Sequence, residues 1–103
     1  MDQCNINSWW KLTTDDEGRP HSYNDMPASQ RYEGNIKVRK WFRNGYPHRD
    51  GGLPSEISDD GTIRYFVNGK LHNIDGPAVI KKDGTEQYFI EGIPRLDKNA
   101  QPK

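Results

Sequence analysis

Short runs of alternating hydrophobic and polar residues are separated by turns that contain glycine. The clearest runs are residues 36–43 and 62–67, and each of them leads into an Asn-Gly pair. Because successive side chains of a strand point to opposite faces, this alternation predicts β-strands. An Asn-Gly pair after such a run predicts a tight hairpin, since both central residues of a type I′ turn need a positive φ. No segment has the periodicity of a long amphipathic helix, so the pattern predicts an all-β protein.

The turns recur with a nearly constant period. Three of them lie 24 and 23 residues apart: Asn44-Gly45, Asn68-Gly69 and Glu91-Gly92. A second series has the same spacing of 23 residues: Asp60-Gly61 and Asp83-Gly84. A period of this length indicates an array of small supersecondary units. We therefore expect a meandering antiparallel sheet of repeated β-hairpins with little or no helix.

Three segments are expected along the chain. Residues 1–30 are predicted to be a degenerate first repeat with a longer loop, residues 31–96 the hairpin repeats, and residues 97–103 a flexible tail. The length of 103 residues fits one domain, but only 31% of the residues are hydrophobic and the mean hydropathy is −1.11. This composition predicts an ordered structure with a shallow core.

An aromatic pair is expected in each repeat. The pairs are Trp9-Trp10, Trp41-Phe42, Tyr65-Phe66 and Tyr88-Phe89. Along a continuous strand the second members share one face, and Val38 on the face of Phe42 marks that face as the more buried one. Few aliphatic residues remain to cover both faces, so a protein partner or a second copy of the chain is expected to cover one of them. The candidate protein-binding residues are Trp41, Phe42, Tyr65, Phe66, Tyr88 and Phe89.

Two phrases carry a resemblance to a known repeat. Residues 41–51 read WFRNGYPHRDG, and residues 68–78 read NGKLHNIDGPA. Both resemble the MORN-like hairpin repeats found in small phage and large-virus proteins and in bacterial proteins labelled as antitoxin components. The resemblance covers roughly residues 31–95, and the last copy departs from it at Arg95, where a histidine would stand. It implies a hairpin scaffold that serves binding.

Three histidines recur at one position of the repeat: His21, His48 and His72. Equivalent positions of a stacked array lie one repeat apart, too far for three imidazoles to share one metal ion at about 2.1 Å. Each ring is expected to bond locally to the turn that follows it, with Asp25, Asp50 and Asp75 as candidate partners. The chain has no nucleophile elbow and no phosphate-binding glycine loop, which predicts a protein that is not an enzyme and needs no cofactor or metal.

Charge is balanced overall but segregated along the chain. Fifteen Lys and Arg balance fifteen Asp and Glu, yet residues 31–49 hold six basic residues and one acidic residue. On one strand face, a basic strip with an aromatic ring inside it is predicted from Lys37, Arg39, Trp41 and Arg43. Such a strip is the minimum for gripping phosphate and stacking a base. A solvated strand whose cations pair with neighbouring acids explains the same pattern.

These observations favour a non-enzymatic protein-interaction module. The resemblance implies a small phage-encoded protein that binds and inhibits a host defence protein. One alternative is a nucleic-acid-binding accessory protein that uses the basic strip, and another is an antitoxin or immunity partner. A homodimer is also compatible with the aromatic surface. Cys4 is the only cysteine, and no stretch approaches the ~20 apolar residues of a membrane span. A cytoplasmic protein without membrane contact is therefore expected.

Overall fold

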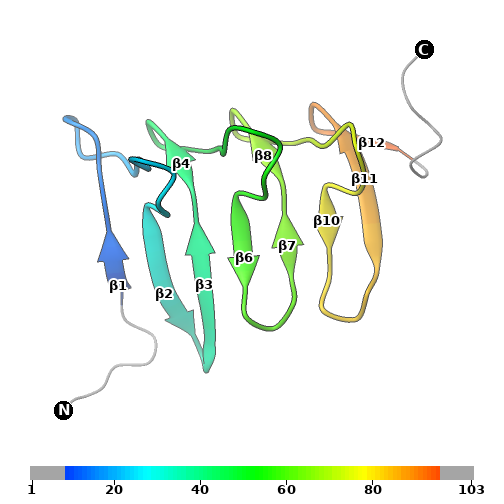
Figure 1. Cartoon of the computed structure of the whole chain (residues 1–103), viewed down its shortest axis with the longest axis horizontal. Coiled ribbons are helices and arrows are strands. Elements are labelled where there is room, and N and C mark those ends of the chain that lie inside the picture. Colours follow the sequence, from blue (N-terminus) through cyan, green and yellow to red (C-terminus); the bar gives the residue numbers. More distant parts are fainter. Residues whose placement is uncertain (1–8, 96–103) are drawn as a thin grey trace.

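The computed structural model describes residues 9–95, which form strands, turns and loops with no helix among them. Cys4 and the predicted tail at 97–103 lie outside these residues. One eight-stranded antiparallel sheet, in the order β1-β2-β3-β6-β7-β10-β11-β12, is accompanied by the two-stranded sheets β4-β5 and β8-β9 (Figure 1). The strands are β1 (Trp9–Leu12), β2 (Ser29–Glu33), β3 (Ile36–Lys40), β4 (Phe42–Arg43), β5 (Tyr46–Pro47), β6 (Glu56–Ser58), β7 (Ile63–Arg64), β8 (Phe66–Val67), β9 (Lys70–Leu71), β10 (Val79–Ile80), β11 (Glu86–Ile90) and β12 (Ile93–Arg95). The predicted all-β class is confirmed.

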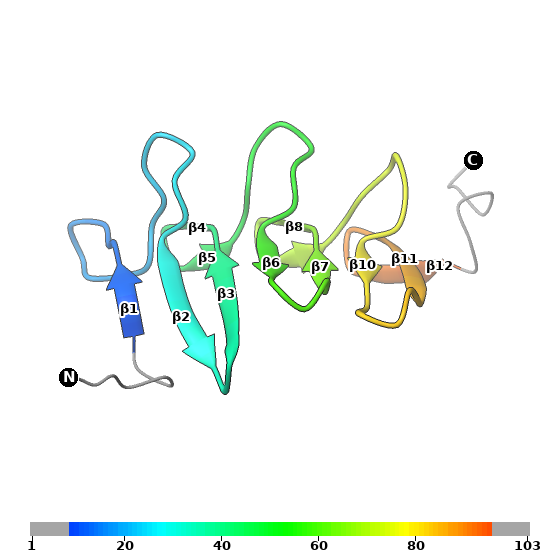
Figure 2. The ribbon, with the colours of Figure 1, turned by 60° about the horizontal axis from the view of Figure 1, so that its bottom comes forward.

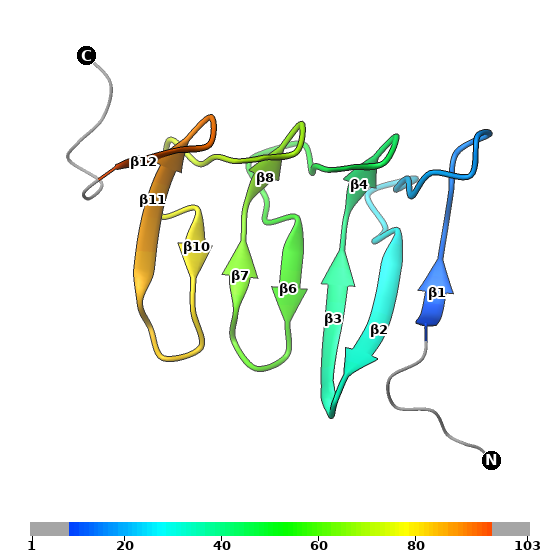
Figure 3. The ribbon, with the colours of Figure 1, turned by 180° about the vertical axis from the view of Figure 1, so that it is seen from behind.

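Each repeat combines strands of the large sheet with a short hairpin and a loop. The short hairpins β4-β5 and β8-β9, and the end of β11 with β12, line up along one end of the large sheet (Figure 3). Three loops lead back into the large sheet. The first follows the turn at residues 16–18, and the other two follow the short hairpins β4-β5 and β8-β9. We call them loop A (residues 21–28), loop B (residues 48–55) and loop C (residues 72–78). Figure 2 shows them rising side by side from the sheet.

Backbone hydrogen bonds connect each short hairpin to the preceding one. The glycine of each turn donates its N–H to a carbonyl of the preceding unit, from the residue that comes just before the histidine of that unit. The distance is 2.8 Å in each case: Gly45 to Pro20, Gly69 to Pro47 and Gly92 to Leu71. Backbone groups that are buried without a partner are costly, so these bonds complete the junctions between units. The stack is therefore held by repeated polar contacts as well as by its shallow core.

The Asn-Gly turns have the backbone that the sequence predicts. Asn68 and Gly69 have φ values of +52° and +85°, and the pair at Asn44 has +46° and +91°. Both central residues are thus left-handed, as a type I′ turn requires. Gly69 is needed for a second reason, because a Cβ there would lie 3.1 Å from Cδ1 of Tyr46, which packs over the turn from the preceding unit. The predicted hairpins at these turns are confirmed.

The first unit aligns with the others in an unexpected way. The N–H groups of Thr13 and Trp41 make equivalent hydrogen bonds, to the last carbonyls of loop A and loop B. Trp9 lies four residues earlier, in β1, opposite Arg31 of β2. The predicted alignment of Trp9-Trp10 with the other aromatic pairs is therefore wrong, because the hydrogen-bond register of the sheet places a threonine pair in that position.

The core is shallow, as the composition predicts. The buried apolar residues are Ala28, Val38, Trp41, Ala78, Val79 and Ile90. Trp41 is only 5% exposed, whereas Phe42 is half-buried. The expectation that Phe42 lies on the more buried side is wrong here, because β3 ends at Lys40 and Phe42 begins a separate two-stranded sheet. Alternation along a strand does not continue across such a break.

Candidate functional site

Four of the seven exposed large apolar side chains of the described residues lie on the loops, and the other three, Leu12, Tyr46 and Ile93, lie on strands. Tyr23 and Met26 of loop A are 47% and 52% exposed, Leu53 of loop B is 44% exposed, and Ile74 of loop C is 60% exposed. The three loops rise side by side from the sheet (Figure 2), so these residues belong to neighbouring loops. We call loops A, B and C together the loop surface. Neighbouring apolar groups that remain in water are typical of interaction sites.

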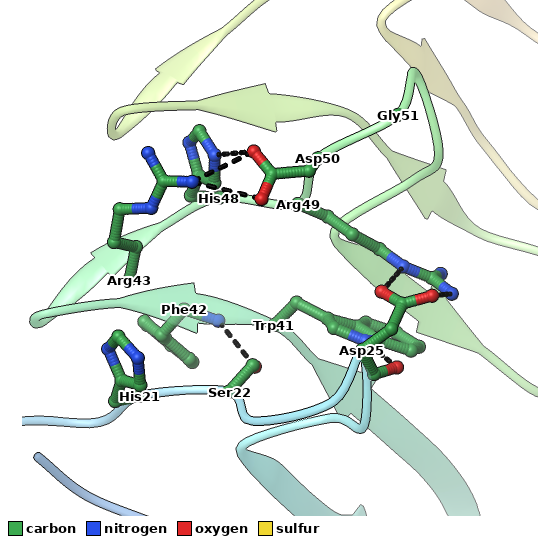
Figure 4. Close-up of a pocket in the computed structure, with 10 residues that line it drawn as sticks. All are labelled: His21, Ser22, Asp25, Trp41, Phe42, Arg43, His48, Arg49, Asp50 and Gly51. Atoms are coloured by element: carbon green, nitrogen blue, oxygen red, sulfur yellow. Dashed lines mark hydrogen bonds and ion pairs between the residues drawn. The ribbon is translucent and has the colours of Figure 1, made fainter.

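A polar pocket of about 420 Å³, which we call the first pocket, lies between loop A and loop B (Figure 4). Its lining consists of His21, Ser22, Asp25, Trp41, Phe42, Arg43, His48, Arg49, Asp50 and Gly51. These residues come from the two loops and from β4 with the residue before it. The charged side chains among them form two ion-pair groups, which are described in turn.

Arg49 joins loop B to loop A over the buried Trp41. Its Nε and Nη2 donate to the two carboxylate oxygens of Asp25 at 2.9 and 3.1 Å, and Nη1 donates to the carbonyl of Pro54 at 3.1 Å. The guanidinium lies 3.9 Å from the centre of the Trp41 ring, whose Nε1 donates to the carbonyl of Asp25 at 3.0 Å. These bonds from Arg49 hold the pKa of Asp25 below its usual range. The two loops are thus clamped together.

Asp50 receives the second group of bonds. Nε2 of His48 donates to it at 2.8 Å, and Nη2 of Arg43 donates to both of its oxygens at 2.9 Å (Figure 4). The hydrogen bond from His48 and the charge of Arg43 lower the pKa of Asp50. His48 itself is buried, with 7% exposure, so its ring is fixed between this carboxylate and the next repeat.

The three histidines share one role, which differs from the expected one. Nδ1 of each ring accepts the N–H of a turn residue in the next short hairpin: Asn44 to His21 at 3.0 Å, Asn68 to His48 at 2.9 Å and Glu91 to His72 at 2.9 Å. Accepting at Nδ1 leaves the proton of the neutral ring on Nε2. The expectation of a bond to the following aspartate holds for His48 alone among the three. Within residues 9–95, no three His, Cys, Asp or Glu side chains are placed to hold a metal ion.

A more apolar pocket of about 250 Å³, the second pocket, lies between loop B and loop C. It is lined by Arg49, Gly52, Leu53, Tyr65, Phe66, Val67, His72, Asn73, Ile74 and Asp75. Arg49 borders both pockets, so the two are neighbours on the loop surface. The second pocket contains the exposed Leu53 and Ile74 and is the more apolar of the two pockets.

The predicted protein-binding aromatics have mainly structural positions. Trp41 is buried beneath Arg49, and the other five are half-buried: Phe42, Tyr65, Phe66, Tyr88 and Phe89. Trp41 and Phe42 line the first pocket, and Tyr65 and Phe66 line the second. Four of the six predicted residues thus line the two pockets, and their role in binding stays a prediction. The exposed side chains of the loops were not predicted, because the loops have no periodicity.

Arg49 was also missed by the sequence analysis. It directly follows a repeated histidine, at a position where loop A has Ser22 and loop C has Asn73. A charged residue at a position that is otherwise small and polar was the one available signal. Its partner Asp25 lies 24 residues away, and only the stacking of the loops brings the two together.

The structure does not bring the predicted basic strip onto one strand face. Lys37 and Arg39 lie on β3, whereas Arg43 lies on β4 in a different sheet. Arg39 pairs with Asp59 at 3.0 Å and Arg43 with Asp50, while one face of the Trp41 ring is covered by Arg49. Nucleic-acid binding by these four residues stays a prediction that none of these contacts favours.

The fold defines a protein of stacked β-hairpin units with a loop surface along one side. No family model, no curated protein and no solved structure matches the chain. The resemblance to MORN-like repeats therefore stays a prediction. No helix in the part of the chain described here could cross a membrane.

Proposed function

We propose that the chain is a non-enzymatic protein-interaction module that binds a partner protein through the loop surface. The observation that carries this proposal is the set of apolar side chains on neighbouring loops, each 44–60% exposed: Tyr23, Met26, Leu53 and Ile74. Burying such side chains against a partner removes apolar area from water, which is the main driving force of association.

The supports beneath these side chains strengthen the proposal. Arg49 clamps loop A to loop B, and His48 ties loop B to the next hairpin through Asn68. A surface held in place before binding loses little conformational freedom when the partner docks. The loops therefore present their apolar side chains in an arrangement suited to specific recognition.

Capture by loop variants tests the proposed function. Immobilised wild-type protein, the double variant Leu53→Ser/Ile74→Ser and the control Ile93→Ser are each exposed to nuclease-treated bacterial lysate. Ile93 is 56% exposed on β12 and belongs to none of the three loops, so its substitution controls for the loss of an exposed apolar side chain outside the loop surface. We expect one stoichiometric protein with wild type and control, and capture reduced at least about tenfold by the double variant with an unchanged melting temperature. Undiminished capture by the folded double variant contradicts the proposal.

The consequence of binding is proposed from the MORN-like resemblance alone. We propose that the partner is a bacterial host defence protein and that binding inhibits it. The activity of the captured protein is measured with and without an equimolar amount of the wild-type chain. Loss of activity supports inhibition, and a captured toxin that is neutralised supports the antitoxin role instead. Full activity of the bound partner contradicts both.

A further inference from the structure

The first pocket contains hydrogen-bond donors without acceptors. Nδ1 of His21 accepts the N–H of Asn44, so the proton of the neutral ring is on Nε2. Oγ of Ser22 accepts the N–H of Phe42, which leaves its hydroxyl hydrogen available. Within residues 9–95, neither of these donors has a protein acceptor, and Nη1 of Arg43 has none either.

The carboxylates of the first pocket are in the opposite situation. Both oxygens of Asp25 are held by Arg49, and both oxygens of Asp50 are held by Arg43, with His48 as a further donor. Spare donors beside satisfied carboxylates favour a ligand that brings an acceptor. A carboxylate is the strongest such acceptor in a protein, since charge-assisted hydrogen bonds are about twice as strong as neutral ones.

The second pocket has a different requirement. Leu53, Phe66, Val67 and Ile74 form the apolar part of its lining, and Leu53 and Ile74 among them are exposed. Asn73 is engaged within its own loop, since its Nδ2 donates to the carbonyl of Pro77 at 3.0 Å. A large apolar side chain matches this lining.

Two adjacent glycines of loop B lie between the pockets. Gly51 borders the first pocket and Gly52 the second, and a Cβ added at either would meet nothing within 4 Å. The positive φ values here do not by themselves demand glycine, because Asn24 and Asp25 adopt the same region in loop A. The absence of side chains at both positions leaves room for a chain to pass from one pocket to the other.

The distance between equivalent points of the two pockets indicates which backbone conformation a bound segment has. Each repeat adds two strands to the sheet, at about 4.8 Å each, so equivalent points lie about 9.6 Å apart. In a polyproline II segment, residues three apart lie on the same side and about 9.3 Å from each other. Residues three apart in a β-strand point to opposite sides, and an α-helix needs about seven residues to cover this distance.

We infer that the loop surface binds a polyproline II segment of its partner, with a carboxylate in the first pocket and, three residues away, a large apolar side chain in the second. This inference rests on the proposed function and specifies the chemistry of the partner. Aromatic side chains line both pockets, on either side of loop B. The segment crosses loop B at Gly51 and Gly52.

Fluorescence anisotropy with synthetic peptides tests the inference on the full chain. The probe is labelled PPEPPLPP, and its controls are PPQPPLPP, which lacks the charge, and PPEPLPPP, which shortens the spacing. Wild type is expected to bind the probe about tenfold more tightly than either control. The Arg43→Gln variant is expected to bind the first two peptides equally, whereas Ile74→Ser weakens both and keeps the preference for the charged one.

The outcomes separate this inference from the function on which it rests. Equal binding of all three peptides to wild type, or no binding at millimolar concentration, overturns the inference. If partner capture still depends on Leu53 and Ile74 in that case, the protein-interaction function stands and the chemistry of the segment is wrong. If Arg43→Gln keeps the full preference for the charged peptide while remaining folded, the assignment of the carboxylate to the first pocket is overturned.

Discussion

The first and second pockets occupy equivalent places in successive repeats and have opposite chemistry. Counted from the Asn-Gly turns, the equivalent pairs are Arg43 and Val67, Arg49 and Asn73, and Asp50 and Ile74. The first pocket contains the ion pair between Arg49 and Asp25, which joins loop B to loop A, and the ion pair between Arg43 and Asp50. The second pocket has apolar side chains where Arg43 and Asp50 stand in the first. In the second pocket Asn73 binds within its own loop, so this cross-loop clamp is absent there.

The comparison separates residues that hold the stack from residues that define the surface. His48 and His72 both accept a backbone N–H from the next hairpin at 2.9 Å, although their surroundings differ. The turn glycines likewise make the same 2.8 Å bond at each junction. The same contacts thus recur at the junctions between units, whereas the other loop positions differ in chemistry from unit to unit.

The largest difference in stability is expected between variants of two equivalent aromatic residues, Trp41 in the first pocket and Tyr65 in the second. Trp41→Ala removes a buried ring, so the free energy of unfolding should fall by about 3–5 kcal/mol. Tyr65→Ala, at the equivalent position of the second pocket, removes a half-exposed ring and should cost clearly less. Urea denaturation of both variants measures the difference. An equal loss in the two would mean that burial of Trp41 does not distinguish the pockets.

The next largest effect concerns the shared histidines. His48→Ala leaves the N–H of Asn68 without its acceptor and removes a donor from Asp50, and should cost about 1–3 kcal/mol. His72→Ala removes only the bond from Glu91 and should cost less. Thermal denaturation of the two variants provides the comparison. A larger loss for His72→Ala would contradict the assignment of extra bonds to the first pocket.

A smaller effect is expected when the clamp of the first pocket is removed. Arg49→Met keeps an unbranched side chain over Trp41 but loses the cation–π contact, which contributes about 1 kcal/mol. The pKa of Asp25 is lowered in the folded state, so its interaction with Arg49 stabilises the protein above the ordinary carboxyl pKa of about 4 and is lost as the pH falls through the lowered value.

The pH dependence of this clamp is measurable. The stability difference between wild type and Arg49→Met should be largest near neutral pH and should narrow below about pH 4. Asn73→Met is the matched variant in the second pocket, where no carboxylate partner is lost, and its difference from wild type should not narrow in this way. Urea denaturation across the acid range checks both. A gap for Arg49→Met that is constant with pH would show that Asp25 contributes nothing to the clamp.

The smallest change in stability is expected when an ion pair of the first pocket is copied into the second. The double variant Val67→Arg/Ile74→Asp copies one ion pair of the first pocket into the second. Exposed ion pairs contribute little, so the free energy of unfolding should change by no more than about 0.5 kcal/mol. Circular dichroism with urea measures this. A large destabilisation would show that these apolar side chains support the fold as well as the surface.

Local turn chemistry made much of the fold predictable. The Asn-Gly pairs at 44–45 and 68–69 form the expected left-handed turns because few residues other than Asn and Gly adopt positive φ easily. The register of the first unit was not predictable from its aromatics, because hydrogen bonds to the sheet place Thr13 in the position of Trp41. Residue type is a weaker guide to register than the pairing of the strands.

The candidate site was less predictable than the fold. The sequence drew attention to the aromatic pairs, two of which line the pockets, since the pairs repeat with the period of the array. The exposed side chains of the loops and the clamp were not found, because Leu53 and Ile74 lie in loops, and because Arg49 reaches Asp25 only when loop B stands beside loop A. Neither the exposure of a loop side chain nor a contact between loops leaves a periodic trace in the sequence.

By itself, the sequence determined the all-β class, the period of the hairpins and the shallow core, because turn residues, alternation and composition act locally or on average. The tertiary structure alone decided that the strand is interrupted at Trp41, that each histidine accepts an N–H from the next hairpin, and that Arg49 meets Asp25 in the first pocket. These features depend on groups about 20 residues apart that meet only after the units stack.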